Sequence, residues 1–200
     1  MVSSCRIVIA VLEQIVEESM LRDTLFPMNI LREISDKTLG LSDFEILGKH
    51  YELRKSARAI LRKPDGTIAI QYLQNHFLHK LPGGGVDPGE SIQDALAREI
   101  KEEVGCDCSL SHSLGVVIEY REKQSLLHIS ECFVADVVGD IGESSLEQAE
   151  IDEGMITLWI SPESAIRKMK ADTPNTYQGP FITARELAFL EAYSADSTVV

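Results

Sequence analysis

Three glutamates stand close together in the segment AREIKEEVG, residues 97–105. If the segment is helical, Glu99, Glu102 and Glu103 occupy positions i, i+3 and i+4, so their side chains share one surface. Like charges so placed destabilise a helix by roughly 0.2–0.5 kcal/mol per pair. Carboxylate oxygens are also the ligands that Mg²⁺ prefers, and a bound cation would offset the repulsion. The three residues alone allow two interpretations, a solvated charged face and a cation site.

A loop rich in glycine and proline, LPGGGVDPGE at 81–90, comes directly before this segment. Gly83, Gly84 and Gly85 have no Cβ, so they adopt conformations closed to other residues and let the backbone approach an ion or ligand closely. Such a loop, leading into a helix with several carboxylates, would supply backbone carbonyls and hard oxygen ligands together. This combination favours a Mg²⁺ site that also holds substrate phosphates.

The stretch 84–106 resembles the Nudix box, Gly-x5-Glu-x7-Arg-Glu-U-x-Glu-Glu-x-Gly-U, in which U is a bulky apolar residue. The seven fixed positions are matched by Gly84, Glu90, Arg98, Glu99, Glu102, Glu103 and Gly105. Ile100 meets the first U, whereas Cys106 departs mildly from the second, where Ile, Leu or Val is usual. Seven chance matches would occur at on the order of 10⁻⁸ per starting position. LPGG before the box and WISPE (159–163) also resemble Nudix features, so the resemblance covers about residues 53–193.

The resemblance implies an α/β fold, the Nudix-type α/β/α sandwich with a mixed β-sheet. Nudix enzymes hydrolyse a nucleoside diphosphate linked to another group, and they depend on Mg²⁺ or Mn²⁺. The implied metal ligands are the Gly83 carbonyl and the carboxylates of Glu99, Glu102 and Glu103. Glu99 would be either a further ligand or the base that activates water.

Other box positions are implied to support the site. Arg98 would orient the glutamates and balance their charge, and Glu90 would hold the loop against the helix. Gly84 and Gly105 would have structural roles at the two ends of the motif. These supporting residues complete the set that the box assigns.

Candidates outside the box rest on position alone. Many Nudix enzymes use a further glutamate, and SLEQAEIDEGMITLW (145–159) offers Glu150 and Glu153, although a solvent-exposed acidic loop is the alternative. Tyr120, Phe77 and His79 would border a pocket for the base or leaving group. For a single histidine, a surface or structural role is the alternative.

The remaining pattern predicts one α/β domain. Pro64-Asp65-Gly66 joins two strand-like runs, 55–63 and 66–73, into a hairpin. Ser91 begins a helix that Gly105 ends, and its apolar ridge faces the core. Further strands are predicted at 114–121, 127–138 and 155–161, and further helices from Ser161-Pro162 and over 183–193.

The first 50 residues lie outside the resemblance and are expected to form an N-terminal extension to a Nudix domain at 51–195. Apolar residues at helical spacing in 4–22 predict an amphipathic helix. Met28 would be a plausible native start, so residues 1–27 are either a real extension or a dispensable translation artefact.

Charge and composition exclude some classes of binding partner and some locations. A net charge of −13 argues against binding to DNA or RNA polymers, which needs a basic surface. The run IVIAVL (7–12) is too short for a membrane helix, and the expected location is the cytoplasm. Cys106 and Cys108 fit alternating strand positions better than a metal site, because no matching Cys/His pair accompanies them. The resemblance also leaves a homodimer open.

The sequence is compatible with more than one class of substrate. KLPGGGVDPGES (80–91) looks most like the MutT-type branch, which often acts on nucleoside triphosphates. ADP-ribose or another nucleoside diphosphate derivative is an alternative substrate. A non-hydrolytic nucleotide-binding protein is a different class, and the intact box argues against it. An isopentenyl diphosphate isomerase would need a cysteine-containing motif that the sequence lacks.

Overall fold

The computed structural model describes residues 29–42 and 50–196, so the predicted helix at 4–22 lies outside the described residues. Within them, seven strands form one sheet in the order β1-β5-β6-β2-β3-β4, with β7 paired to β3. The strands are β1 (Ile30–Ser35), β2 (Glu52–Arg62), β3 (Ile68–Leu73), β4 (Leu78–Lys80), β5 (Asp107–Arg121), β6 (Leu126–Val138) and β7 (Met155–Ile160). The helices are α2 (Ile92–Val104), α3 (Gln148–Asp152), α4 (Pro162–Ala171) and α5 (Gly179–Ala195), with 3-10 turns η1 (Gln74–His76) and η2 (Glu122–Gln124).

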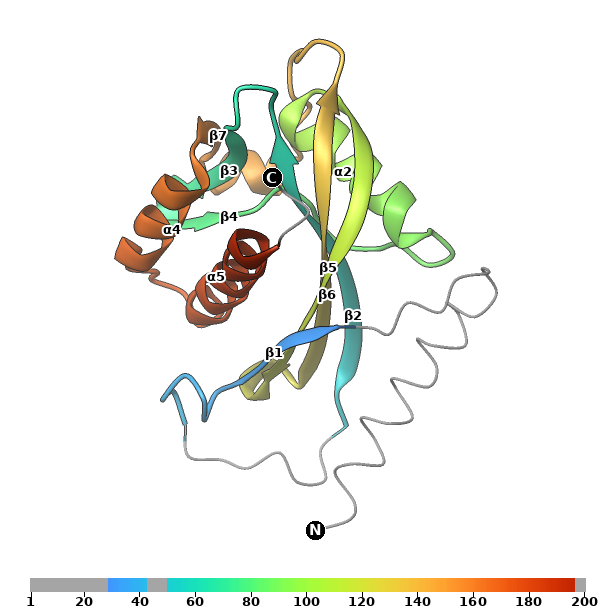
Figure 1. Cartoon of the computed structure of the whole chain (residues 1–200). Helices are drawn as coiled ribbons and strands as arrows, with labels where there is room; N and C mark the ends of the chain where they lie inside the picture. The colour runs from blue at the N-terminus through green and yellow to red at the C-terminus, as the bar shows by residue number, and fades with distance from the viewer. Residues whose placement is uncertain (1–28, 43–49, 197–200) are drawn as a thin grey trace.

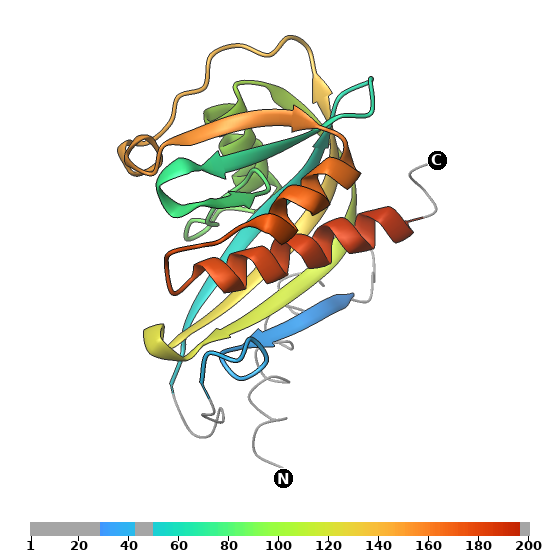
Figure 2. The same ribbon diagram turned by 90° about the vertical axis from the view of Figure 1, so that its left-hand side faces the viewer.

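The sheet is mixed and is covered on both faces. β1 runs parallel to β5 and β2 runs parallel to β6, whereas the other pairings are antiparallel. Helix α2 covers one face, and α4 and α5 lie across the other (Figures 1 and 2). The α/β/α arrangement with a mixed sheet, predicted from the sequence, is confirmed. None of the described helices combines the length and apolarity that a membrane span requires.

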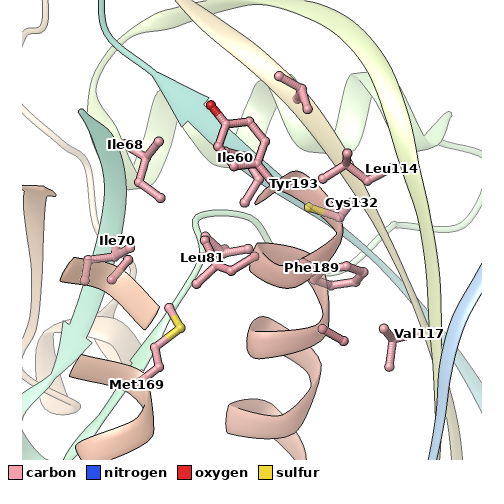
Figure 3. Packing of buried hydrophobic residues seen from close by; sticks show 14 of the residues in the cluster. Ile60, Ile68, Ile70, Leu81, Leu114, Val117, Cys132, Met169, Phe189 and Tyr193 are labelled. Carbon is pink, nitrogen blue, oxygen red and sulfur yellow. The ribbon is translucent and has the colours of Figure 1, made fainter. Parts of the chain in front are cut away.

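Two apolar clusters hold these layers together. The larger lies between the sheet and helices α4 and α5, and Ile60, Leu81 and Phe189 meet there without exposed surface (Figure 3). In the second, Leu96 and Ile100 of α2 pack on the opposite face and are also fully buried. Burying each such side chain contributes about 1.5–3 kcal/mol. The second cluster fixes the height at which α2 carries its glutamates above the sheet.

The ends of α2 follow from local chemistry. The Ser91 side chain accepts a hydrogen bond from the Asp94 backbone N–H at 3.1 Å, and it caps the helix start. Gly105 ends the helix with φ 79°, a left-handed conformation that glycine adopts at little cost. Both boundaries predicted from the sequence are confirmed, as are the β2–β3 hairpin and the Ser161-Pro162 start of α4.

Several elements differ from the prediction. The sequence predicts no strand at β1 or β4 and no helix at α3, and each is short. β5 begins at Asp107, not at 114, because irregularities between Leu110 and His112 and between Ser113 and Gly115 break its alternation. α5 begins at Gly179, four residues before the predicted start. β1 belongs to the segment expected to be an extension, yet it forms an edge strand of the same sheet.

Candidate active site

Three acidic side chains converge beside α2. Ligand oxygens of Glu99, Glu103 and Glu150 all lie within 4.8 Å of one another. Glu99 and Glu103 come from α2, whereas Glu150 comes from α3, far along the chain. Glu103 is 2% exposed, and the other two are partly buried. This set of hard oxygen donors fits a divalent cation such as Mg²⁺, which would relieve their mutual repulsion.

The electrostatics of the three carboxylates differ. Burial, reinforced by the charge of Glu103, raises the pKa of Glu150 to about 7. Burial also raises the pKa of Glu99, although the neighbouring Arg98 opposes this. For Glu103 burial again opposes ionisation, but Lys80 and nearby cationic and N–H groups outweigh it and hold its pKa below the ordinary value. Two of the three carboxylates therefore favour a bound proton or cation.

Glu103 is held by two fixed donors. Lys80 at the end of β4 places its ammonium 2.9 Å from Glu103 Oε1, and the Gly83 backbone N–H donates to Glu103 Oε2 at 2.6 Å. The Gly83 carbonyl, predicted to be a metal ligand, accepts a hydrogen bond from the Arg58 guanidinium. Neither Lys80 nor Arg58 is predicted from the sequence as a site residue.

The glycine loop packs closely against strand β2 and against Glu99 of helix α2. A Cβ on Gly83, which has φ 122°, would lie 2.2 Å from the Ala57 carbonyl oxygen of β2. A Cβ on Gly84 would lie 2.3–2.4 Å from the carboxyl atoms of Glu99. The Gly84 carbonyl accepts from the Ala57 N–H at 3.0 Å, which fastens the loop to β2. Close approach to the β2 backbone requires glycine at position 83, whereas a Cβ at position 84 would displace the Glu99 carboxyl group.

Arg98 connects the loop to the acidic face of α2. Its guanidinium donates to both Glu90 oxygens at 3.0 Å and to Glu99 Oε1 at 2.9 Å. It also donates to Glu102 Oε2 at 3.3 Å and to the Gly85 carbonyl at 3.2 Å. The geometry suits a residue that orients the glutamates and balances their charge.

Two predicted acidic residues lie apart from the cluster. Glu102 bonds to Arg98, and its carboxylate is not one of the three that converge. Glu153 ends α3, with Oε1 3.5 Å from His76 Nε2, and it also lies outside the cluster. Of the two acids proposed beyond the box, the structure brings only Glu150 to the site.

The predicted substrate-binding residues do not gather at the cluster. Tyr120 is 9% exposed and packs edge-on against Tyr51, with ring centroids 6.2 Å apart. His79 is buried, with Nδ1 2.7 Å from Asp172 Oδ1 and its ring stacked on Tyr72. Phe77 is 49% exposed.

Lys80 and Arg58, the site residues that were not predicted, differ in how clearly the sequence signals their role. Lys80 immediately precedes LPGG, and a lone cation beside a glycine loop is a usable signal. Arg58 lies in a strand-like run, and only the pairing of the loop with β2 places it near Gly83. The choice of Glu150 over Glu153 likewise depends on how α3 packs.

Comparison with known proteins identifies the family. The family model for the NUDIX domain matches residues 52–179, well over half of the chain. The chain belongs to the NUDIX family. An ADP-ribose pyrophosphatase of Methanocaldococcus jannaschii is 29% identical over 118 residues, covering 58% of this chain and 70% of that protein. A Bacillus subtilis protein, provisionally named as an 8-oxo-dGTP diphosphatase, is 30% identical over 123 residues, covering 58% and 76%.

Solved structures agree on the Nudix fold. A NUDIX hydrolase from Nitrosomonas europaea superposes with a TM-score of 0.55 at 20% identity, covering 74% of this chain and 96% of that chain. The E. coli ORF135 protein superposes with a TM-score of 0.52 at 21% identity, covering 72% and 91%. The family match and the named relatives make the chain a Nudix hydrolase, and the acidic cluster agrees with the divalent cation that such hydrolases generally use.

Proposed function

We propose that this protein is a Mg²⁺-dependent pyrophosphohydrolase of nucleoside diphosphates linked to a further group X. The observation that carries the proposal is the convergence of Glu99, Glu103 and Glu150 within 4.8 Å, beside a glycine loop. The donor set fits Mg²⁺, or Mn²⁺ in its place, because all three ligands are carboxylate oxygens. The products would be a nucleoside monophosphate and the phosphorylated X.

Each residue has a distinct part in this mechanism. Glu99, Glu103 and Glu150 would hold the cation, which when bound neutralises the diphosphate and lowers the pKa of water. Lys80 keeps Glu103 ionised and, with the Gly83 N–H, fixes its orientation. A carboxylate of the cluster, Glu99 or Glu150, accepts the proton of the attacking water.

Arg98 positions this machinery. Because it bonds Glu90, Glu99 and Glu102 together, it keeps the loop and the helix in register. Glu102 bonds to Arg98 through Oε2 and lies outside the three converging carboxylates, so we assign it a supporting role.

Substitution of the clustered glutamates tests the proposal. We expect Glu103→Gln and Glu150→Gln each to lower kcat/KM by about 100-fold or more, because each removes a charged ligand. Glu153→Gln should retain turnover, since Glu153 lies outside the cluster. Glu163→Gln, an exposed acid at the start of α4, is the matched control.

The measurement is release of nucleoside monophosphate from a panel of nucleoside diphosphate derivatives and nucleoside triphosphates, with Mg²⁺ or Mn²⁺. Full Mg²⁺-dependent turnover by Glu103→Gln would refute the metal assignment. Binding of panel members without any hydrolysis by the wild type would favour a nucleotide-binding protein instead. The intact box and the assembled cluster favour hydrolysis.

A further inference from the structure

The side chain of Gln71 is buried in the sheet and has no hydrogen-bond partner in the described part of the chain. Gln71 lies in β3, between β4 and β7, and has no exposed surface. Neither its Nε2 nor its Oε1 meets a partner among the described residues. Leaving a buried amide unpaired costs free energy, and such groups are rare in folded proteins. The amide therefore calls for a partner that is not part of the chain.

The register of the sheet places Gln71 on the face that carries the acidic cluster. Gln71 lies opposite Lys80 of β4 and opposite Thr157 of β7, so these side chains point to the same face. Ala69, two residues before Gln71, packs in the apolar cluster that α2 forms on the sheet. Because residues two apart in a strand share a face, Gln71 also faces α2.

Both of these neighbours of Gln71 contact Glu103. The Lys80 ammonium lies 2.9 Å from Glu103 Oε1, and the Thr157 hydroxyl donates to the Glu103 carbonyl oxygen at 3.5 Å. Glu103 is the most buried acid of the cluster, at 2% exposed. Gln71 thus lies between the two side chains that connect the sheet to the central carboxylate of the candidate cation site.

The hydrogen-bonding groups on this face suit ordered water. The Lys80 ammonium has further N–H donors besides the one that Glu103 accepts, and the Thr157 oxygen has lone pairs. Water between them can accept from Lys80 and from Gln71 Nε2, and can donate to Gln71 Oε1 and to Thr157. Buried waters typically make about three such bonds to groups that otherwise lack partners.

Space for water lies next to these groups. Glu103 and Thr157 both line a cavity of about 320 Å³ between the end of α2, residues 141–146 and β7. A water molecule takes up roughly 30 Å³ in the liquid, so the cavity has room for several. Water can therefore reach the sheet side of Glu103 from this cavity.

We propose that Gln71 is a positioning residue of the cation site, and that it acts through ordered water on the Lys80 ammonium. The inference rests on the proposed function, because Glu103, which Lys80 holds, is one of the three carboxylates assigned to the cation. Water bound by the Gln71 amide anchors the ammonium on the side of the sheet. The anchored ammonium keeps the Glu103 carboxylate in one orientation, so the cation meets a ligand that is already in place.

The residue type at position 71 supports this role. Ala69 and Leu73, which lie two residues away on the same face of β3, are both apolar and buried. Replacing an unpaired buried amide by an apolar group of the same shape is nearly neutral or stabilising. Glutamine at this position is therefore not explained by packing, and residues of this kind are typical of functional sites.

Substitution by methionine separates positioning from folding, because methionine has a similar shape but no amide. We expect Gln71→Met to raise the dissociation constant for Mn²⁺ about tenfold or more and to lower kcat by a similar factor, since partners that orient a metal ligand contribute effects of about 10–100-fold. The urea midpoint should stay equal or rise. Mn²⁺ binding to the protein alone is measured from the EPR signal of the free ion.

Two results with Gln71→Met would overturn the inference. Unchanged Mn²⁺ affinity and kcat would show that the amide has no part in the site. A lower urea midpoint would show that the amide has a structural role in the sheet.

A double-mutant cycle tests whether Gln71 acts through Lys80. Because Lys80→Met removes the ammonium itself, the variant that carries both substitutions should bind Mn²⁺ with the same dissociation constant as Lys80→Met alone, within about twofold. Losses that multiply would show that the two side chains act independently, and would also overturn the inference.

Thr183 provides the matched control. Its hydroxyl is also buried without a partner among the residues described, but it belongs to α5, which covers the opposite face of the sheet (Figure 1). Thr183→Val removes this hydroxyl at nearly constant shape, so Mn²⁺ affinity and kcat should stay at the wild-type values. An equal loss in Thr183→Val would show that the effect is not specific to Gln71, and would refute its positioning role.

The proposed function and the role of Gln71 fail in different experiments. A wild-type protein that neither binds Mn²⁺ saturably nor hydrolyses any nucleotide would refute the proposed function. Saturable Mn²⁺ binding that Glu103→Gln abolishes and Gln71→Met leaves intact would refute the role of Gln71 alone.

Discussion

Gly84 and Gly85 are adjacent residues with opposite tolerance for a side chain. A Cβ on Gly84 would overlap the Glu99 carboxyl group, whereas a Cβ on Gly85 would come no nearer than 3.8 Å to the Arg54 guanidinium. Neither residue requires positive φ. A different effect of alanine at these two positions would therefore come from contact with Glu99 and not from backbone strain.

At this residue scale, we expect Gly84→Ala to lower kcat/KM by about 100-fold, because displacing a catalytic group by about 1 Å has effects of that size. Gly85→Ala should change activity little and the free energy of unfolding by no more than about 0.5 kcal/mol. Steady-state kinetics and urea unfolding of both variants provide the measurements. Equal activity losses in the two variants would show that the loop, not contact with Glu99, limits turnover.

Part of the site could be predicted from local spacing. Glu99 and Glu103 share a helix, so their proximity follows from helical geometry alone. Glu150 joins them only because α3, which contacts β7, carries its side chain to theirs, and Lys80 only because β4 ends there. Such contacts depend on tertiary packing, which single-residue patterns do not encode.

At the scale of elements, a buried ionic network joins β5, β6 and α5. Glu119 accepts hydrogen bonds from Arg121 at 2.6 Å and Arg185 at 3.2 Å, and its Oε2 lies 3.0 Å from His128 Nδ1. His128 Nε2 lies 3.0 Å from the Ser56 hydroxyl. Burial lowers the pKa of His128 to about 4 despite the Glu119 charge, so the folded protein keeps this histidine neutral.

This network predicts a pH dependence of stability. Unfolded His128 has a pKa of about 6.5, so between pH 6.5 and 4 the unfolded chain binds more protons than the folded protein. The contribution of His128 is therefore complete above pH 6.5 and is lost as the pH falls, by about 3 kcal/mol at pH 4. Urea unfolding from pH 7.5 to 4 measures this. His128→Gln should show a smaller loss over that interval, and an equal loss would assign the dependence to other groups.

The elements that can be predicted from the sequence are those whose own residues carry strong signals. α2 carries a cap, an apolar ridge and a terminal glycine, and each signal lies within the helix itself. β1, β4 and α3 are six, three and five residues long and lack such signals. A strand of this length is defined by its partner, as β1 is by β5, so its sequence alone does not reveal it.

At the scale of the whole molecule, β1 closes one edge of the sheet and connects distant parts. It pairs with β5 from Ile30 to Ser35, and the following Asp36 is fully buried. Asp36 Oδ2 accepts from the Glu122 backbone N–H at 2.9 Å and from the Tyr177 hydroxyl at 2.8 Å. The segment before residue 50 thus contributes to the folded unit, although the matched family domain begins at residue 52.

We expect a chain that starts at residue 50 to be less stable than one that starts at Met28. Removing β1 exposes the edge of β5 and leaves the Asp36 partners unpaired, which should cost about 2 kcal/mol or more. Urea midpoints of the two truncated proteins measure the difference. Equal midpoints would show that β1 is dispensable.

Glu150 also gives the whole molecule a cross-link that depends on solution conditions. A cation held by α2 and α3 would close the long stretch of chain between Glu103 and Glu150 into a loop, much as a disulfide does. By mass action, its stabilising effect grows with the free cation concentration relative to the dissociation constant. The melting temperature of the hydrolase should therefore follow the divalent ion supply, so that resistance to unfolding and readiness for catalysis rise together.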